Sequence, residues 1–257
     1  MLDCLAVPQP GDPFVIPKPN ELYAALIKRT PGRLRIGWST EPLMGMEADA
    51  GVCSAIARVA QVLAGMGHDV AEESPQFGGL DALRSMMDVY FFGFDLRLAS
   101  YAKRTGRVIS RETLEPVTFA IYEHAKAMKP EQFFSGMAST NAMRRKLGAY
   151  FTRYDVWLSP TAPRTSEPWG NYNFGRTDVA FDEIAEKLYR GFAQFTAPHN
   201  TIGTPAISLP LATPENPVSV LWSEDRVIGQ WPNLGLWGGS DSDQLKCEAL
   251  RLRNQQS

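Results

Sequence analysis

The sequence predicts an α/β fold, a mixed β-sheet flanked by helices, from three features. Residues 34–38 and 68–72 each have the pattern of a short strand, and a segment with helical periodicity separates them. Two further short apolar segments, residues 155–159 and 206–209, are bordered by prolines, which tend to stand at strand ends. Long helical patterns lie between these strands, and such a mixture is typical of an α/β domain.

The first part of the chain predicts a connector followed by a strand–helix–strand unit. Residues 1–20 contain five prolines, which fix φ and remove backbone donors, so we expect an extended connector. Residues 21–28 predict a short helix. The helix after Asp49, a residue that can cap it, is predicted to end at Gly67, because glycine readily adopts the conformation that terminates helices. Its apolar stripe consists of Val52, Ile56, Val59, Leu63 and Met66. Such a unit is expected to form a right-handed crossover.

The middle of the chain predicts three helices, at about residues 81–103, 116–128 and 130–151. The second and third begin at prolines, which suit the first turn of a helix because the N–H they lack would have no partner there. The side chains of the first helix that we expect in the core are Met86, Met87, Tyr90, Phe91 and Phe94. Those expected to face inward from the third helix are Phe133, Met137, Ala142 and Leu147.

The last part of the chain predicts fewer elements. Residues 162–180 are rich in Pro, Gly, Asn and Thr and predict a loop, whereas residues 181–195 predict an amphipathic helix. The strand at 206–209 follows. Beyond residue 211 the periodicity weakens, and the further element that we expect is a helix at residues 241–252.

Composition excludes several classes of partner. The net charge is −2 and we expect no basic stripe, so no nucleic-acid partner is predicted. The most apolar stretch, residues 89–94, is far shorter than the about 20 residues that span a bilayer, so no membrane partner is predicted. Cys4, Cys53 and Cys247 are widely separated, so we expect no disulfide and no structural metal site. No cofactor is expected either. Asp3 stands where a secretory signal would carry Lys or Arg, which leaves a cytoplasmic location as the default.

No catalytic residue can be recognised from the sequence. The G-x-S-x-G motif of a nucleophile elbow is absent. Gly238-Gly-Ser240 lies in the irregular tail, where we interpret it as a turn. His68 and His124 are expected to have structural roles. For His199, packing near a pocket is favoured over general-base chemistry.

Two segments predict a binding edge. The strand at 155–159 ends in Ser159-Pro-Thr161, and ligands of open α/β sheets bind at the carboxyl ends of strands. In the segment 201–206, Gly203 and Pro205 predict a tight bend that lets the backbone come close to another group. The alternative is a strand end without a ligand and a bend that packs against a neighbouring helix.

These segments belong to an ordered set of motifs that resembles the amidase-signature family. In particular, Asn200–Pro210 is similar to the family's Asn-x-x-Gly-x-Pro-Ala-x-Ser-x-Pro segment. The resemblance implies an α/β fold, hydrolysis of amide bonds, and a substrate pocket lined by Ser159, Thr161 and Asn200. The other motifs in the set are Pro10-Gly-Asp-Pro13, Pro31–Gly37 and Ser159–Thr161.

The resemblance also implies where the chemistry lies. The family uses a lysine, a bridging serine and a nucleophilic serine, with an oxyanion hole of backbone N–H groups. In the family all of these precede the position that matches Met1. We therefore expect this chain to be inactive alone and to bind a small amide substrate only when completed by the missing N-terminal half.

The expected organisation is a single partial domain over residues 1–257. It consists of a Pro-rich connector at 1–32, a family-like region at 33–211 and a divergent tail at 212–257. Simple divergence or a change of reading frame would account for the tail. The main alternative function is that of a non-catalytic interaction or scaffold fragment that binds a partner protein, and an enzyme of another class with an unrecognised site is a third. A homo-oligomer is a further expected assembly.

Overall fold

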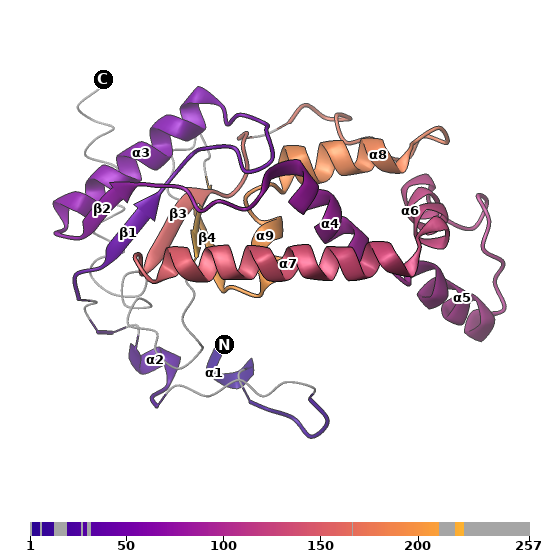
Figure 1. Ribbon diagram of the computed structural model, residues 1–257, viewed down its shortest axis with the longest axis horizontal. Coiled ribbons are helices and arrows are strands. Elements are labelled where there is room, and N and C mark those ends of the chain that lie inside the picture. The colour runs from indigo at the N-terminus through magenta and orange to yellow at the C-terminus, as the bar shows by residue number, and fades with distance from the viewer. Residues whose placement is uncertain are drawn as a thin grey trace.

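The computed structural model describes residues 2–5, 7–12, 20–26, 28–29, 32–165, 167–210 and 219–223. Its centre is a five-stranded sheet with the order β2-β1-β3-β5-β4 (Figure 1). The strands are β1 (Arg35–Trp38), β2 (Asp69–Glu72), β3 (Val156–Pro160), β4 (Ala206–Pro210) and β5 (Ser219–Ser223). Strands β2, β1 and β3 are parallel, and β5 runs antiparallel to both β3 and β4. The predicted α/β fold with a mixed sheet is therefore confirmed.

One face of the sheet is covered by α3 (Ala50–Gly65), which connects β1 to β2. Because side chains alternate along a strand, Ile36, Val156 and Leu158 point to this face, where they pack against the apolar stripe of α3. The helix ends as predicted, and Gly67 has a left-handed φ of 93°. Asp49 does not cap it with its side chain. Its backbone N–H instead donates to the carbonyl of Pro163 at 2.8 Å, which ties the start of α3 to the loop after β3.

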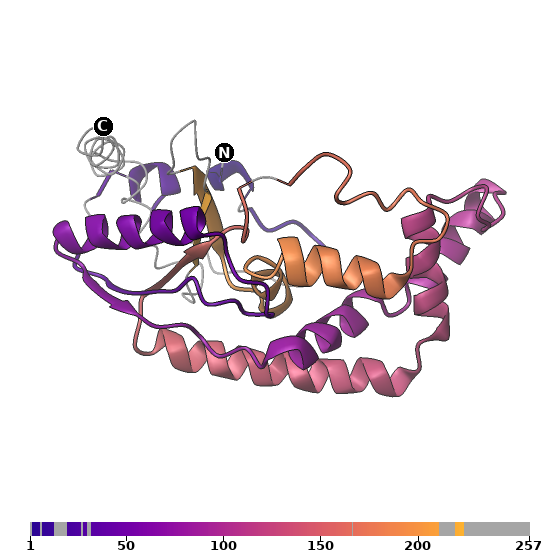
Figure 2. The same cartoon turned by 90° about the horizontal axis from the view of Figure 1, so that it is seen from above.

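The opposite face is covered by α4 (Gly79–Phe91) and α7 (Pro130–Phe151), so the sheet lies between two helical layers (Figure 2). Trp157 of β3 points to this side and is fully buried. It packs with residues of four other segments: Phe77, Met86, Leu147 and Phe195. Gly37 of β1 allows α7 to come close, because a Cβ at this position would lie 1.8 Å from the hydroxyl oxygen of Tyr150.

The predicted helix at 81–103 is wrong in one respect, because it is two helices. Gly93, with φ of 73°, separates α4 from α5 (Phe94–Thr105). Only Gly adopts this backbone conformation without strain, so the chain turns here although the apolar pattern continues. Met86, Met87 and Phe91 are buried as expected, whereas Tyr90 is 67% exposed. Helix α5 buries no residue and forms a hairpin with α6 (Pro116–Ala127).

Helix α7 has its predicted bounds, but its buried stripe differs from the predicted one. Ala142 is exposed rather than inward-facing. Gly136 is buried because α4 passes directly over it, and a Cβ there would lie 2.7 Å from the carbonyl oxygen of Ser85. This close approach of α4 fixes the rotation of α7 about its own axis and therefore decides which of its residues are buried. The buried residues are Gly136, Thr140, Met143, Leu147 and Tyr150.

The remaining elements are short. Near the N-terminus, α1 (Leu2–Leu5) supplies Asp3, whose carboxylate accepts from the N–H of Tyr23 at the start of α2 (Tyr23–Leu26) at 2.6 Å. The predicted loop at 162–180 is followed by α8 (Phe181–Ile184), which continues as the π-helix η1 (Ala185–Phe192). Helix α9 (Ala197–Ile202) then leads into β4. Strand β5 was not predicted, and the predicted helix at 241–252 lies outside the described residues.

The contact at Gly136 predicts the effect of one substitution. Gly136→Ala places a methyl group against backbone of α4 that cannot move without shifting the helix, so we expect a loss of about 1–3 kcal/mol in the free energy of unfolding. Gly65→Ala is the control, because nothing lies within 4 Å of its Cβ position and alanine favours a helix by up to about 1 kcal/mol. Urea unfolding of the unchanged chain and of the two variants measures both changes in the free energy of unfolding. A Gly136→Ala chain as stable as the Gly65→Ala chain would contradict the contact.

Candidate functional site

The carboxyl ends of β1 and β3 lie side by side, and the chain leaves them toward opposite faces of the sheet. From β1 it continues to α3, whereas from β3 it reaches α9 on the face of α7, where Ala197 joins the cluster around Trp157. Ligands of open α/β sheets bind outside the carboxyl ends of the strands at such a switch point. This edge is therefore the candidate site.

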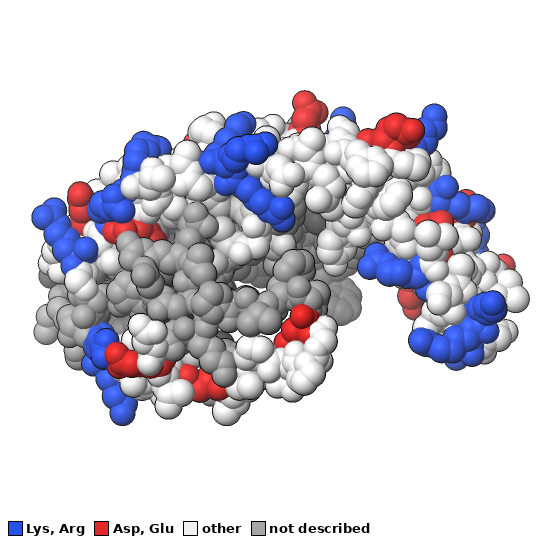
Figure 3. All heavy atoms as spheres, turned by 60° about the horizontal axis from the view of Figure 1, so that its bottom comes forward, with Lys and Arg blue, Asp and Glu red and all other residues white. Residues whose placement is uncertain are grey.

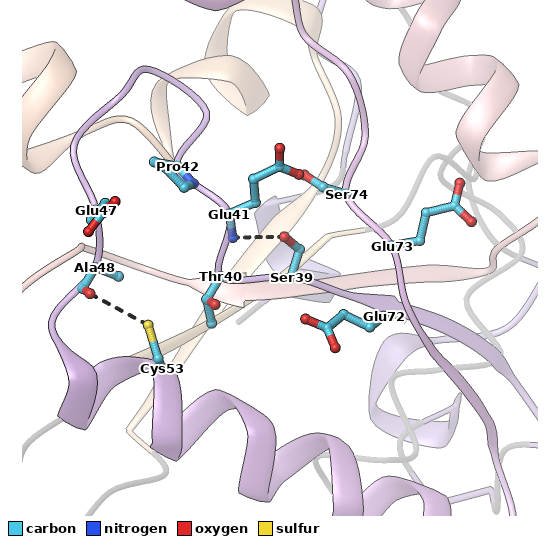
Figure 4. A pocket seen from close by; sticks show the side chains of 10 residues that line it. All are labelled: Ser39, Thr40, Glu41, Pro42, Glu47, Ala48, Cys53, Glu72, Glu73 and Ser74. Carbon is cyan, nitrogen blue, oxygen red and sulfur yellow. Dashed lines mark hydrogen bonds between the residues drawn. The ribbon is translucent and has the colours of Figure 1, made fainter.

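A pocket of about 470 Å³ opens at this edge, between the ends of β1 and β2 and the first turn of α3 (Figure 4). It is formed by the segment after β1, by the last residue of β2 with the two that follow, and by the start of α3. The lining residues are Ser39, Thr40, Glu41, Pro42, Glu47, Ala48, Cys53, Glu72, Glu73 and Ser74.

Ser39 connects the pocket to β1 and β3. Its backbone N–H donates to the carbonyl of Leu158 at 3.1 Å, and its hydroxyl accepts from the N–H of Glu41 at 2.9 Å. Both bonds hold the turn after β1 in place. Sequence reasoning did not select Ser39, although it follows a predicted strand, as Thr161 does. Its position directly after a predicted strand is the signal that would have identified Ser39.

The pocket is rich in carboxylates. Glu41, Glu47 and Glu72 are exposed, and none of the ion pairs of the described residues includes them. Glu73 differs, because its carboxylate points away from Ser39 (Figure 4). It accepts from the Tyr154 hydroxyl at 2.7 Å and pairs with Arg153, and these two bonds hold the pKa of Glu73 below its usual value. The carboxylates suit a ligand with donors or positive charge. Among the described residues, no group of three His, Cys, Asp or Glu side chains could hold a metal ion.

Thr161 lies at this edge, directly after the end of β3. Its hydroxyl shares a hydrogen bond of 2.9 Å with the hydroxyl of Ser208 on β4. The loop after β3 is held against the start of α3, beside the pocket, by two interactions. These are the backbone hydrogen bond between Asp49 and Pro163 and an ion pair of Arg164 with Asp49 at 3.9 Å. Thr161 is half-buried, so its hydroxyl is partly accessible.

Ser159 and Asn200 lie in different surroundings. Ser159 is fully buried in the sheet, where its hydroxyl donates to the carbonyl of Pro160 at 3.3 Å. Asn200 is exposed on α9, and the helix ends three residues later at Gly203, with φ of 79°. None of the hydrogen bonds found for the described residues joins Asn200 to Ser159 or Thr161. The role of the three residues in a pocket stays a prediction.

The histidines have structural surroundings. His199 is only 4% exposed, its Nδ1 lies 2.7 Å from the Thr204 hydroxyl, and its ring packs on Trp157 with centroids 5.5 Å apart. Burial lowers the pKa of His199 to about 4, so the ring is neutral at neutral pH. The Nδ1 of His68 accepts from the N–H of Leu34 at 3.2 Å. The ring of His124 stacks on Phe181. Gly238-Gly-Ser240 lies outside the described residues.

A family model described as Amidase matches residues 1–225. The chain therefore belongs to the amidase family. The match continues beyond residue 211 and includes β5. The division of the chain into a connector, a family-like region and a divergent tail stays a prediction.

Two curated relatives are 6-aminohexanoate-cyclic-dimer hydrolases, from Pseudomonas sp. (strain NK87) and from Paenarthrobacter ureafaciens. Each is 31% identical over 221 residues, which are 82% of this chain and 44% of the relative. The solved structure of 6-aminohexanoate cyclic dimer hydrolase matches with a TM-score of 0.77 and 22% identity, over 95% of this chain and 49% of the other. A bacterial aryl acylamidase matches with a TM-score of 0.67 and 14% identity, over 88% of this chain and 48% of the other. The chain thus spans about half the length of its relatives. Within the described residues, no helix is long and apolar enough to cross a membrane.

The burial of His199 predicts a pH dependence of stability. Its pKa is about 4 when folded and 6.5 when unfolded, so between these values the unfolded chain binds more protons. The free energy of unfolding should therefore fall as the pH drops from 6.5 to 4, with a contribution of up to about 3 kcal/mol from this residue. His199→Asn keeps an amide near Nδ1 but cannot titrate. Urea unfolding at several pH values should show a smaller acid loss for the variant, and an equal loss in both proteins would contradict the assignment.

Proposed function

We propose that this chain forms the scaffold and the substrate-facing edge of an amide hydrolase. The observation that carries the proposal is the family match over residues 1–225. The sequence contains no recognisable nucleophile, and the chain spans 44% of the hydrolases that it resembles. The two serines and the lysine expected from the family are therefore assigned to the half of the family domain that this sequence does not span.

In this proposal the carboxyl edge of the sheet orients the amide. A substrate amide offers one N–H donor and one carbonyl acceptor, and groups that can both donate and accept are suited to bind it. The shared hydroxyls of Thr161 and Ser208 and the exposed amide of Asn200 are such groups. The nucleophilic serine would attack the carbonyl carbon, the amine would leave with a proton, and water would release the acid. Holding the amide in place makes this attack effectively intramolecular.

The substrate class that we propose is a small aliphatic amide that releases an amine. The names of the two relatives support it, because hydrolysis of an amide of 6-aminohexanoate yields a carboxylate and an ammonium group. The carboxylates of Glu41, Glu47 and Glu72, which form no ion pair with another described residue, also support it, since they would attract such an ammonium group.

The test is amide hydrolysis by this chain coexpressed with the N-terminal half of an amidase-family domain. The cyclic dimer of 6-aminohexanoate, a linear aliphatic amide and an aryl amide serve as probes, with released amine as the readout. Hydrolysis of the aliphatic probes is expected. A folded product that releases no amine from any of the three would contradict the proposed function.

The edge residues can be tested in that same protein. Thr161→Ala and Asn200→Ala should each lower kcat/KM about tenfold or more, because a lost hydrogen bond in a substrate site costs about 1.4 kcal/mol or more. Thr161→Ser keeps the hydroxyl and should retain most of the activity. Thr177→Ala, in the exposed part of the same loop, is the control and should behave like the unchanged protein. Full activity in both alanine variants would remove these residues from the site.

A separate prediction concerns residues 1–257 alone. We expect no hydrolysis of the three probes above background, because loss of the nucleophile costs on the order of a millionfold in serine hydrolases. The measurement is amine release by the purified chain over a long incubation. Turnover that copurifies with the chain and disappears on Ser240→Ala would show that the chain carries its own nucleophile.

A further inference from the structure

The loop between β1 and α3, residues 40–48, forms one wall of the pocket. The pocket residues that it carries are Thr40, Glu41, Pro42, Glu47 and Ala48 (Figure 4). Backbone hydrogen bonds of Ser39 and Asp49 fix the two ends of this loop. Within the part of the chain that the structure describes, no backbone group of residues 40–48 bonds to another backbone group. The middle of the loop therefore depends on side chains for its hydrogen bonds.

Two side chains from a distant part of the sequence supply these bonds. The Oε1 of Gln194 accepts from the N–H of Met44 at 3.3 Å, and its Nε2 donates to the carbonyl of Met46 at 2.6 Å. The Nε of Arg190 donates to the carbonyl of Met44 at 3.1 Å. Gly45 forms the bend between the two methionines, with φ of 89°, in the left-handed region that favours glycine. The loop is thus held at its centre by Gln194 and Arg190.

The surroundings of Gln194 are unusual for a glutamine. Its side chain is fully buried, whereas glutamine mostly lies at protein surfaces. Buried polar groups need hydrogen-bond partners, and both polar atoms of this amide find theirs on the loop. Gln194 also follows the π-helix η1, whose last turn is closed by a bond of 2.7 Å from the N–H of Ala193 to the carbonyl of Leu188. Turns of this rare kind are frequent at functional sites.

The segment that holds the loop also leads to the amide-binding edge. Directly after Gln194 the chain enters α9, which carries Asn200. In the proposed function Asn200 binds the amide of the substrate, while the carboxylates of the pocket attract its ammonium group. One stretch of chain therefore contacts the elements that hold both ends of such a substrate.

Charge acting at long range does not explain how an ammonium group would be selected. The net charge of the chain is only −2, and acidic and basic side chains occur side by side on the face shown in Figure 3. A mixed surface of this kind steers a cation weakly. Selection therefore depends on where single carboxylates of the pocket are held.

We propose that Gln194, assisted by Arg190, is a positioning residue that holds the carboxylate of Glu47 in the pocket wall, where it selects substrates with an ammonium group. The inference rests on the proposed function and adds to it the residue that sets its specificity. The carbonyl of Met46 belongs to the same peptide group as the N–H of Glu47, so the bond from Gln194 fixes the point from which the Glu47 side chain starts. A preorganised carboxylate binds a cation better than a mobile one, because less conformational entropy is lost.

The first test is hydrogen exchange of the Met44 amide in the full chain, measured by NMR. Gln194→Met keeps a side chain of similar size but removes both strong hydrogen bonds, so this amide should exchange about fivefold faster or more. Arg190→Met removes the neighbouring bond at a partly exposed residue and should raise the same rate by a smaller factor. An unchanged exchange rate of the Met44 amide in both folded variants would overturn the proposal.

Val62→Ala is the control for a general loss of stability. Val62 is buried near the end of α3, about 13 Å along the helix from Cys53 and the pocket. Its truncation leaves a small cavity without touching the loop. It should change the exchange of the Met44 amide no more than that of the amides in β1 and β3.

The second test is the substrate preference of the chain coexpressed with the N-terminal half of an amidase-family domain. The probes are 6-aminohexanamide and heptanamide, which have similar lengths although only the first carries an ammonium group. Gln194→Met should lower the ratio of their kcat/KM values about threefold to fivefold, which is the range that partly exposed ion pairs contribute. Val62→Ala should leave the ratio unchanged, because a general loss of stability affects both probes equally.

The outcomes separate this inference from the proposed function. A preference for 6-aminohexanamide that persists in Gln194→Met, or that falls equally in Val62→Ala, would show that Gln194 does not set the specificity. An assembly that hydrolyses neither amide contradicts the proposed function, and the exchange of the Met44 amide then still decides whether Gln194 positions the loop.

Discussion

The packing of Tyr150 against the backbone of Gly37 is the contact on which the arrangement around the sheet depends. It joins the end of α7 to β1 at a distance that no residue with a Cβ at position 37 would permit. The same hydroxyl donates to the carbonyl of Glu73, just after β2, at 3.1 Å. Burial raises the pKa of Tyr150, so the hydroxyl keeps its proton and the bond persists at all physiological pH values. One side chain thereby positions a helix, a strand and one wall of the pocket.

The candidate site follows from this arrangement together with two backbone hydrogen bonds. The end of β1 is fixed to β3 through the N–H of Ser39 and the carbonyl of Leu158, and the loop after β3 is fixed to α3 through Asp49 and Pro163. The pocket and Thr161 therefore lie on a framework of backbone hydrogen bonds. Side chains placed by such a framework lose little conformational entropy when they bind a ligand, which is the usual advantage of a preorganised site.

Much of the fold could be predicted because its local signals agree with its tertiary contacts. The apolar stripe of α3 and the proline at the start of α7 are each signals that lie within a single helix. The errors came from a glycine with a left-handed backbone conformation and from contacts between distant segments. Gly93 interrupts a helix whose apolar pattern continues, and Gly136 rotates α7 because α4 lies against it. Strand β5 has a weak pattern of alternating apolar residues, and its pairing with β3 and β4 on its two sides makes it a strand. At the site, the sequence predicts the position of Thr161 at the end of a strand, but the burial of Ser159 depends on neighbouring strands that the sequence does not place.

The position of β5 has a consequence for the order of assembly. Strand β4 precedes β5 in the chain, yet β5 separates it from β3, so β4 has no neighbour in the sheet until residues 219–223 have been added. During synthesis from the N-terminus, the parallel strands can pair early, while β4 waits for a segment that leaves the ribosome later. The hydroxyls of Thr161 and Ser208 then meet only in this last step. The binding edge is therefore completed together with the sheet, and a nascent chain that stops before residue 219 would have a folded core without its edge.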